Sequence, residues 1–357
     1  MFKDFLPPLV HDVNHTPPFY GHEKLFEKFL HSLQAQTLHH AWLLTGPQGI
    51  GKATAAKILA RFLLRHADDS YPTEIPLSEP EDAIGRQTLE GTHPDFILIE
   101  KGEEGLSASK NFITIDAVRH VTQSIQQTSS HNGWKVVIVD SLDDMNEKAQ
   151  NALLKSLEEP SQKTIFFLIN HTASTLSPTI RSRCQEVKLQ PLSPVLMEAF
   201  IKSNHLALTD AEKNLLILMA KGRLGIFQSL IAYQGLTLLD QIMDAIKEVL
   251  TRQQAPYPLC FKMSETLLKE GDIVRDLFYY LMTWYGHRTT ERIATKDFSN
   301  PFNDKEKEIF NLLRPLSLEK WLTAQENILE SMHDEQSLKL EPKQTILSCF
   351  TAFERAL

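Results

Sequence analysis

The chain has 357 residues, which is too long for one ordinary core and fits two or three compact units. Hydrophobic residues make up 42% and charged residues 23%, a balance that excludes a disordered or membrane-embedded protein. The net charge of −8 disfavours an autonomous nucleic-acid binder, because phosphate contacts need lysine and arginine gathered on one face.

The first residues, MFKDFLPPLVHDV, lack the basic region and long apolar stretch of a signal peptide. No apolar run reaches the ~18 residues that a membrane span needs. We therefore expect a cytoplasmic protein with no membrane partner. Cys184, Cys260 and Cys349 are far apart and have no ligand spacing, which predicts neither a disulfide framework nor a metal site.

Short apolar runs alternate with helix-like segments between residues 41 and 189. The predicted strands are Ala41–Leu44, Phe96–Ile99, Val136–Val139 and Ile165–Ile169. Each is nearly continuous in apolar residues, as strands covered by helices on both faces require. This alternation predicts an α/β domain with a parallel sheet.

The stretch GPQGIGKAT, residues 46–54, follows the first predicted strand and opens an amphipathic helix, as a phosphate-binding loop does. Glycines let backbone N–H groups turn toward phosphate oxygens, and the lysine neutralises the β and γ phosphates. Its candidate nucleotide-binding residues are Gly46, Gly49, Gly51, Lys52 and Thr54. A glycine-rich turn without a ligand is the less favoured alternative, because strand and helix flank the loop correctly.

Ala53 stands where a serine or threonine normally gives its hydroxyl to Mg²⁺. Thr54 comes one residue later and points about 100° further round the helix. The pattern predicts at most weak binding of ATP or ADP and leaves open whether Mg²⁺ is positioned.

The third predicted strand ends in Asp140, where a carboxylate can approach the Mg²⁺ of a bound nucleotide. Hydrolysis also needs a group that orients water, commonly a glutamate beside that aspartate, and Ser141 stands there instead. Asp143 and Asp144 are better explained as solvated turn acids. Like Ala53, Ser141 indicates a site that does not hydrolyse ATP.

Local signals place the remaining elements. The acidic, proline-bearing segment from His66 to Glu90 is predicted to be a surface excursion. Asp116 is predicted to cap one helix, and Asn146 to cap another that ends at Pro160. The residues expected on the buried faces of these two helices are Val118, Val121, Ile125, Ala149, Leu153 and Leu157.

After Pro191 the strand pattern disappears and the chain reads as helical. Ser193-Pro194 and the capping box from Thr209 to Glu212 predict helix starts, and Gly222 predicts a helix end. The character changes again near Gly235. The predicted domains are therefore 1–192, 193–236 and 237–357.

The short basic stretch TIRSRC, residues 179–184, precedes a last predicted strand. An arginine at such an edge can reach the γ-phosphate of a neighbouring subunit and stabilise charge in phosphoryl transfer. A lone surface arginine is more often only a solvated charge. The residues alone leave both interpretations open.

Taken together, these stretches resemble clamp-loader subunits of the AAA+ superfamily, and most closely their delta-prime group in bacterial DNA polymerase III. The resemblance runs from about Phe19 to Ser193 and is looser beyond. Its most specific parts are NALLKSLEEP and TIRSRC. It implies a P-loop NTPase-like α/β domain of the AAA+ type, a small helical lid domain and an all-α collar domain.

The resemblance also implies roles for single residues. Arg183 falls on the arginine that acts in trans on a neighbouring subunit, and Arg181 is a second candidate. Lys52 matches the phosphate-loop lysine and Asp140 the metal-site aspartate. Asn170 matches the polar sensor of the γ-phosphate.

Departures from the family pattern are as informative as the matches. Beside Ala53 and Ser141, Gly225 stands where motor subunits carry a second sensor arginine. Many members hold zinc through four cysteines after the phosphate-loop helix, and the segment from His66 to Glu90 has none. The resemblance thus implies a site with no zinc and without the residues for hydrolysis.

Three functions remain to be compared. The first is a non-hydrolysing subunit that supplies Arg183 to a neighbour's ATP, with gamma/tau and delta subunits, the sliding clamp and primed DNA as partners in a hetero-pentamer. The second is an ATP-hydrolysing motor subunit of the gamma/tau type, so that the enzyme assignment stays open. The third, an independent DNA-binding module, is disfavoured by the charge.

Overall fold

The computed structural model describes residues 19–66, 70–77, 82–101, 112–126, 133–172, 176–253, 257–338 and 341–355. These residues form two compact units. The α/β unit holds the described residues up to Leu206 together with Gly222–Leu224. The helical unit holds Ala207–Lys221 and the described residues from Gly225 onward. The predicted boundaries at 192/193 and 236/237 stay predictions.

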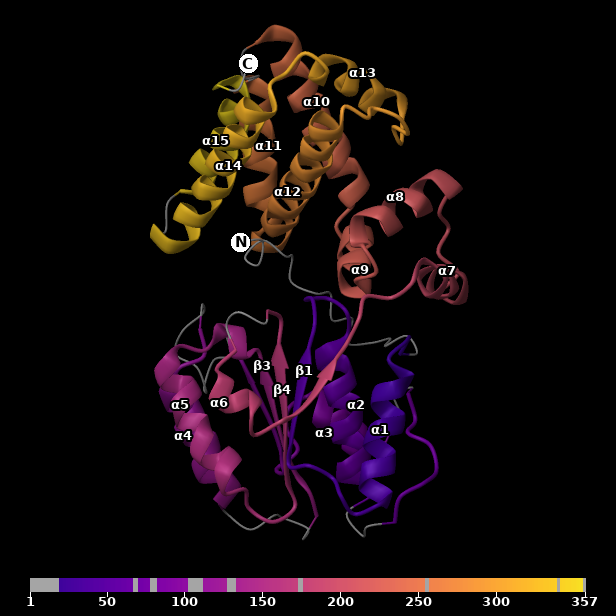
Figure 1. Ribbon diagram of the computed structural model, residues 1–357, viewed down its shortest axis with the longest axis vertical. Helices are drawn as coiled ribbons and strands as arrows, with labels where there is room; N and C mark the ends of the chain where they lie inside the picture. Colours follow the sequence, from indigo (N-terminus) through magenta and orange to yellow (C-terminus); the bar gives the residue numbers. More distant parts are fainter. Residues whose placement is uncertain are drawn as a thin grey trace. The chain divides into compact units, whose positions relative to one another are not determined.

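A five-stranded parallel sheet forms the centre of the α/β unit (Figure 1). Its strands are β1 (Ala41–Thr45), β2 (Phe96–Glu100), β3 (Lys135–Asp140), β4 (Thr164–Asn170) and β5 (Gln185–Lys188). The strand order is β2-β3-β4-β1-β5, and all neighbouring pairs are parallel. The α/β prediction is confirmed, and each of the four predicted strands lies within one residue of its observed bounds.

Helices cover both faces of the sheet (Figure 1). On one face lie α1 (Glu23–Gln34) and α2 (Lys52–Arg65). On the other lie α4 (Ile115–Gln126), α5 (Glu147–Glu158) and α6 (Pro178–Arg181). Successive side chains of a strand point to opposite faces, so Trp42 and Leu44 join the first core and Leu43 the second.

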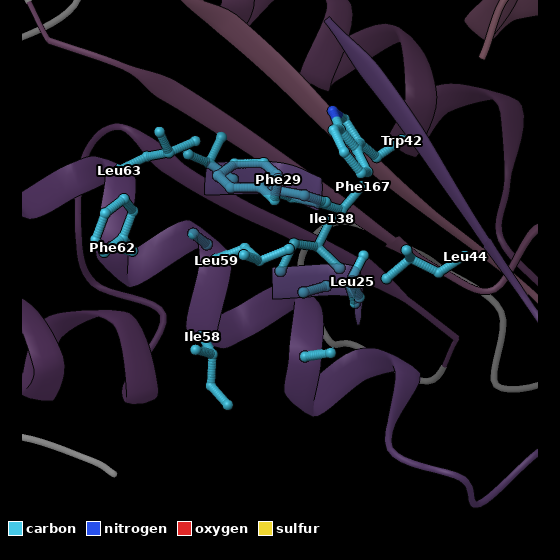
Figure 2. Packing of buried hydrophobic residues seen from close by; sticks show 14 of the residues in the cluster. Leu25, Phe29, Trp42, Leu44, Ile58, Leu59, Phe62, Leu63, Ile138 and Phe167 are labelled. Atoms are coloured by element: carbon cyan, nitrogen blue, oxygen red, sulfur yellow. The ribbon is translucent and has the colours of Figure 1, made fainter. Parts of the chain in front are cut away.

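Phe29 of α1 connects the first helical layer to the sheet (Figure 2). Its ring centroid lies 5.1 Å from that of Trp42 on β1 and 5.9 Å from that of Phe167 on β4. Aromatic pairs in such tilted contacts contribute about 0.5–1.5 kcal/mol beyond their burial. Leu59 and Leu63 of α2 belong to the same cluster, which therefore holds the helix that follows the phosphate loop.

The cap of α4 differs from the prediction. The Ala117 N–H donates to Thr114 Oγ1 at 3.3 Å, and α4 begins at Ile115. Thr114 therefore caps the helix. Asp116 is the second residue of α4, where its negative charge interacts favourably with the positive end of the helix dipole. Both residues are good caps by type, so type alone could not choose between them.

The predicted limits of α5 are confirmed. Asn146 Oδ1 accepts a hydrogen bond from the Ala149 N–H at 2.9 Å, and the helix ends at Glu158, two residues before Pro160. Leu153 and Leu157 are buried in the second core, as the sequence predicts.

Part of the segment from His66 to Glu90 packs on the α/β unit, so the prediction of a surface excursion was wrong there. Ile75 is buried in the first core, and α3 (Ala83–Leu89) packs against α2. Arg65 of α2 donates to both carboxylate oxygens of Asp82, the cap residue of α3, at 2.5 and 2.7 Å. The few apolar residues here have no regular spacing, so periodicity could not reveal this packing.

In the part of the chain after β5 that the structure describes, every regular element is a helix. α7 (Pro194–Ser203) follows β5 in the α/β unit. The helical unit contains α8 (Asp210–Ala220), α9 (Leu224–Ala232), α10 (Gly235–Arg252), α11 (Tyr257–Glu270), α12 (Asp272–Thr295), α13 (Asp304–Leu313), α14 (Leu318–Leu338) and α15 (Pro342–Arg355). The predicted cap at Ser193 and capping box at Thr209 are confirmed.

A mixed apolar and ionic core holds the helical unit. Trp321 of α14 stacks on Phe353 of α15 with ring centroids 4.8 Å apart. The fully buried Glu306 of α13 accepts from Arg288 of α12 at 2.5 and 3.0 Å. None of the helices that the structure describes is both long and apolar enough to cross a bilayer.

Leu153 tests the packing of α5. Its side chain is 1% exposed, so Leu153→Ala removes buried methyl groups and leaves a cavity. We expect the free energy of unfolding of the α/β unit to fall by about 2–5 kcal/mol, measured by urea denaturation. Lys148→Ala, at an exposed position of the same helix, should leave it nearly unchanged; equal effects of the two changes would contradict the packing.

Candidate functional site

The carboxyl ends of three neighbouring strands bring the predicted nucleotide-binding residues together. β1 lies between β4 and β5, and β4 lies beside β3. Asp140 is the last residue of β3, and Asn170, the last of β4, is paired with Thr45 at the end of β1. The phosphate loop follows β1 directly. Strand order thus places residues that are far apart in the sequence at one edge of the sheet.

Backbone geometry explains the glycines of the loop. Gly46 has φ +143°, and a Cβ there would lie 2.5 Å from the carbonyl oxygen of Leu189. Gly49 and Gly51 also have positive φ, at +82° and +97°, and Gly51 is the residue before α2. The turn into the helix amino terminus is therefore the one that the sequence predicts.

His22 also supports this loop, although the sequence reasoning assigned it no role. Its Nε2 lies 2.9 Å from the carbonyl oxygen of Ile50, so the protonated ring nitrogen donates to the loop backbone. Burial lowers the pKa of His22 below its ordinary value. A histidine in the segment just before the first helix was visible in the sequence, but nothing in its spacing indicated this contact.

The ammonium of Lys52 is bound by the loop itself. Its Nζ donates to the carbonyl oxygens of Gly46 at 2.6 Å and Pro47 at 2.7 Å, and the residue is only 3% exposed. Burial lowers the pKa of Lys52 to about 7, while the nearby carboxylates of Asp140 and Asp143 oppose that shift. In this arrangement the ammonium that would contact a phosphate is bound instead by backbone carbonyl oxygens.

Asp140 lies in an environment that disfavours its charge. Burial raises the pKa of Asp140 to about 6, and Glu100, its register partner on β2, raises it further. Lys52 and Lys57 act in the opposite direction. The Oδ1 of Asp140 lies 3.9 Å from His171 Nε2.

Asp143 joins the ends of β3 and β4, so its prediction as a solvated turn acid was wrong. A short 3₁₀ turn, η1 (Leu142–Asp144), brings its carboxylate to β4. There Oδ2 accepts from Asn170 Nδ2 at 3.3 Å and from the His171 N–H at 2.5 Å. The predicted sensor Asn170 is therefore fully buried beside a carboxylate of its own chain.

Ala53 and Thr54 occupy the first turn of α2. Ala53 packs against the first core and offers no hydroxyl. Thr54 lies half-buried one residue further along the helix. The three cysteines are unpaired thiols. Among the described residues, no group of three or more His, Cys, Asp or Glu side chains is placed to hold a metal ion.

Arg183 lies in the turn between α6 and β5. Its Nη1 donates to the Thr179 carbonyl oxygen at 3.0 Å and to Ser182 Oγ at 3.3 Å, and its Nη2 lies 2.6 Å from Glu158 Oε1. Its side chain is 35% exposed. The second candidate, Arg181, binds Glu186 on β5, with Nε 2.8 Å from Oε2. Both arginines are at the surface of the α/β unit.

Arg183 and the phosphate loop lie toward opposite ends of the sheet. Gln185, the first residue of β5, is paired with Trp42 near the start of β1, and Lys188 is paired with Thr45 at its end. The turn with Arg183 precedes β5, whereas the loop follows β1. The structure therefore brings Lys52, Asp140 and Asn170 together and places Arg183 away from them.

Comparisons with known proteins show that the first half of the chain is similar to subunits of DNA polymerase III. Residues 21–193 match a family model described as DNA polymerase III, delta subunit. The chain is 35% identical over 224 residues to the DNA polymerase III subunit delta' of Pseudomonas aeruginosa, a match that covers 62% of this chain and 64% of that protein. It is 36% identical over 169 residues to the subunit delta' of Escherichia coli, covering 46% and 47%.

A further relative is the DNA polymerase III subunit gamma of Buchnera aphidicola subsp. Schizaphis graminum, 33% identical over 165 residues, with 46% of this chain and 42% of that protein covered. The chain thus matches between about two fifths and two thirds of the length of these relatives. Among solved structures it is similar to a DNA polymerase III gamma subunit-related protein of Thermotoga maritima, with 16% identity, a TM-score of 0.43 and coverage of 92% and 100%.

Lys52 makes the stability of the α/β unit depend on pH. Because the pKa of Lys52 falls from 10.5 to about 7 on folding, the unfolded chain binds more protons between these two values. Stability contributed by this group should therefore rise as the pH rises from 7 toward 10. Lys52→Met removes the titrating group and should flatten the rise, measured by urea unfolding at pH 7, 8, 9 and 10.

The control is Lys148→Met, at an exposed position, which should keep the wild-type pH dependence. A wild-type slope in the Lys52 variant would mean that the ammonium is not held in a dry site.

Proposed function

We propose that the chain is a delta-prime-type clamp-loader subunit in DNA replication, because residues 21–193 match a family model of DNA polymerase III subunits and the chain is similar to two delta' subunits. It assists ATP hydrolysis by a neighbouring subunit and does not hydrolyse ATP itself. Its Arg183 reaches in trans to the phosphates of the nucleotide that the neighbour holds.

The position of Arg183 carries this proposal. The residue is partly exposed and lies toward the end of the sheet opposite the chain's own phosphate loop. An arginine at that end of the sheet cannot reach the site that contains Lys52, but it can contact another chain. Arginines that stabilise the charge of a transferred phosphoryl group contribute ~10³ to 10⁵ in rate.

The residues of the chain's own site also support a subunit that assists ATP hydrolysis without performing it. Its glycines and the amino terminus of α2 fit a phosphate group. The residues needed for Mg²⁺ and for water activation do not fit, since Ala53 has no hydroxyl and Ser141 replaces the usual glutamate. Nucleotide, if bound, would be held by the loop and Lys52 after the ammonium leaves its backbone partners.

The partners in this proposal are gamma/tau motor subunits and a delta subunit in a hetero-pentamer, with the sliding clamp and primed DNA bound transiently. The relation to both delta-prime and gamma subunits favours such an assembly. The AAA+ domain would form the interface with the neighbour's ATP, and the helical unit would contribute to the collar. We place this assembly in the cytoplasm, where replication takes place in bacteria.

Arg183→Ala tests the proposal in a complex reconstituted with gamma and delta subunits, clamp and primed DNA. Single-turnover ATP hydrolysis at the site of the adjacent subunit should be slowed ~10³-fold or more. Arg183→Lys should recover little, because an ammonium lacks the planar fork of donors.

Arg181→Ala tests the second candidate in the same assay, since Arg181 is a neighbouring exposed arginine with its own carboxylate partner. It should behave as wild type. Unchanged hydrolysis in the Arg183→Ala complex, with the complex still assembled, would overturn the proposed function.

A further inference from the structure

We propose that Glu158 is the positioning residue for Arg183, holding its guanidinium in place for the phosphates of the neighbouring chain's nucleotide. This inference rests on the function proposed above. Neither the phosphate-loop pattern nor the arginine motif pointed to Glu158, and only the folded chain brings the two residues together.

Two elements hold the guanidinium from different sides. Glu158, the last residue of α5, forms an ion pair with Arg183, with Oε1 2.6 Å from Nη2, and the Thr179 carbonyl of α6 accepts a hydrogen bond from Nη1 at 3.0 Å. Ser182 Oγ adds a longer contact to Nη1 at 3.3 Å. A guanidinium carries five N–H donors, so the three contacts recorded in the described part of the chain leave two for a phosphate.

Both partners are fixed to the same core. Leu157, the residue before Glu158, and Ile180, three residues before Arg183, are buried in the cluster that covers one face of the sheet. α5 and α6 also pack against each other. The ion pair therefore connects two elements that are anchored in one packed core, and such packing is the condition for preorganising a long side chain.

The position of Glu158 at the carboxyl end of α5 is not explained by a contribution to stability alone. The carboxyl end of a helix carries partial negative charge, so an acidic last residue is unfavourable where a basic one would help. The pair is also exposed, at 35% for Arg183 and 49% for Glu158, and exposed ion pairs contribute little to stability. The unfavourable charge at the helix end and the favourable ion pair roughly offset each other. The main consequence of the ion pair is therefore that it holds Arg183 in place.

Positioning matters because arginine is flexible. A free arginine side chain loses the entropy of many rotamers when it is fixed. With Glu158 in place, part of that loss occurs in the folded subunit, before the neighbour's nucleotide arrives. Removing Glu158 should therefore reduce the catalytic contribution of Arg183 without abolishing it.

The test uses the reconstituted complex with Glu158→Ala, Glu158→Gln and Glu159→Ala. Glu158→Ala should lower the turnover number for ATP about tenfold with little change in KM, as expected for a displaced catalytic group. Glu158→Gln keeps an oxygen acceptor and should recover most of the loss. Glu159→Ala changes the adjacent exposed glutamate and should equal wild type.

A double variant separates positioning from a purely structural role. If Glu158 acts through Arg183, adding Glu158→Ala to Arg183→Ala causes no further loss of turnover. A further loss would overturn the inference, and so would an increase in turnover by Glu158→Ala alone, which would make the carboxylate a competitor of the phosphate.

The single variants distinguish the two proposals. If Arg183→Ala lowers turnover and Glu158→Ala does not, only the positioning inference fails. If Arg183→Ala changes nothing, the proposed function fails, and the positioning role fails with it. Thermal unfolding of each variant confirms that it is folded before the kinetics are compared.

Discussion

The register of β1 between β4 and β5 is the constraint on which both functional regions of the α/β unit depend. At its carboxyl end, β1 leads into the phosphate loop beside Asn170. Its amino end faces the start of β5, just after the turn that carries Arg183. One buried strand therefore separates the candidate nucleotide site of the chain from the arginine that we propose to act on another chain. Side chains of β1 pack into the helical layers on both faces of the sheet, and this close packing holds the register.

Two candidate nucleotide-binding residues of the chain's own site are bound by groups of the same chain. Lys52 binds two loop carbonyl oxygens, and Asn170 donates to Asp143. Burial also shifts the pKa of Lys52 down and that of Asp140 up, so each charge is disfavoured at the position where a nucleotide would need it. These contacts and the missing hydroxyl at Ala53 all disfavour the binding of a nucleotide with Mg²⁺. The strand, glycine loop and helix predicted for phosphate binding are present, while Lys52 and Asn170 are bound by groups of their own chain.

Sequence patterns predicted the elements well and the contacts between their ends poorly. Continuous apolar runs located four strands because burial on both faces leaves a direct trace in composition. The cap of α4 was misassigned because Thr114 and Asp116 are both good caps. The roles of Asp143 and Glu158 were missed because each depends on a partner from another element, Asn170 and Arg183. Packing that brings such partners together has no short-range signature.

The most direct test of the whole account compares the chain's own site with the one it is proposed to assist. In the reconstituted complex, Lys52→Met should leave clamp- and DNA-stimulated ATP turnover at the wild-type level, while Arg183→Ala lowers it. That result would mean that the chain contributes an arginine and no functional ATPase site. A steep loss of turnover with Lys52→Met, together with ATP hydrolysis by the chain alone, would contradict the account and identify the chain as a motor subunit.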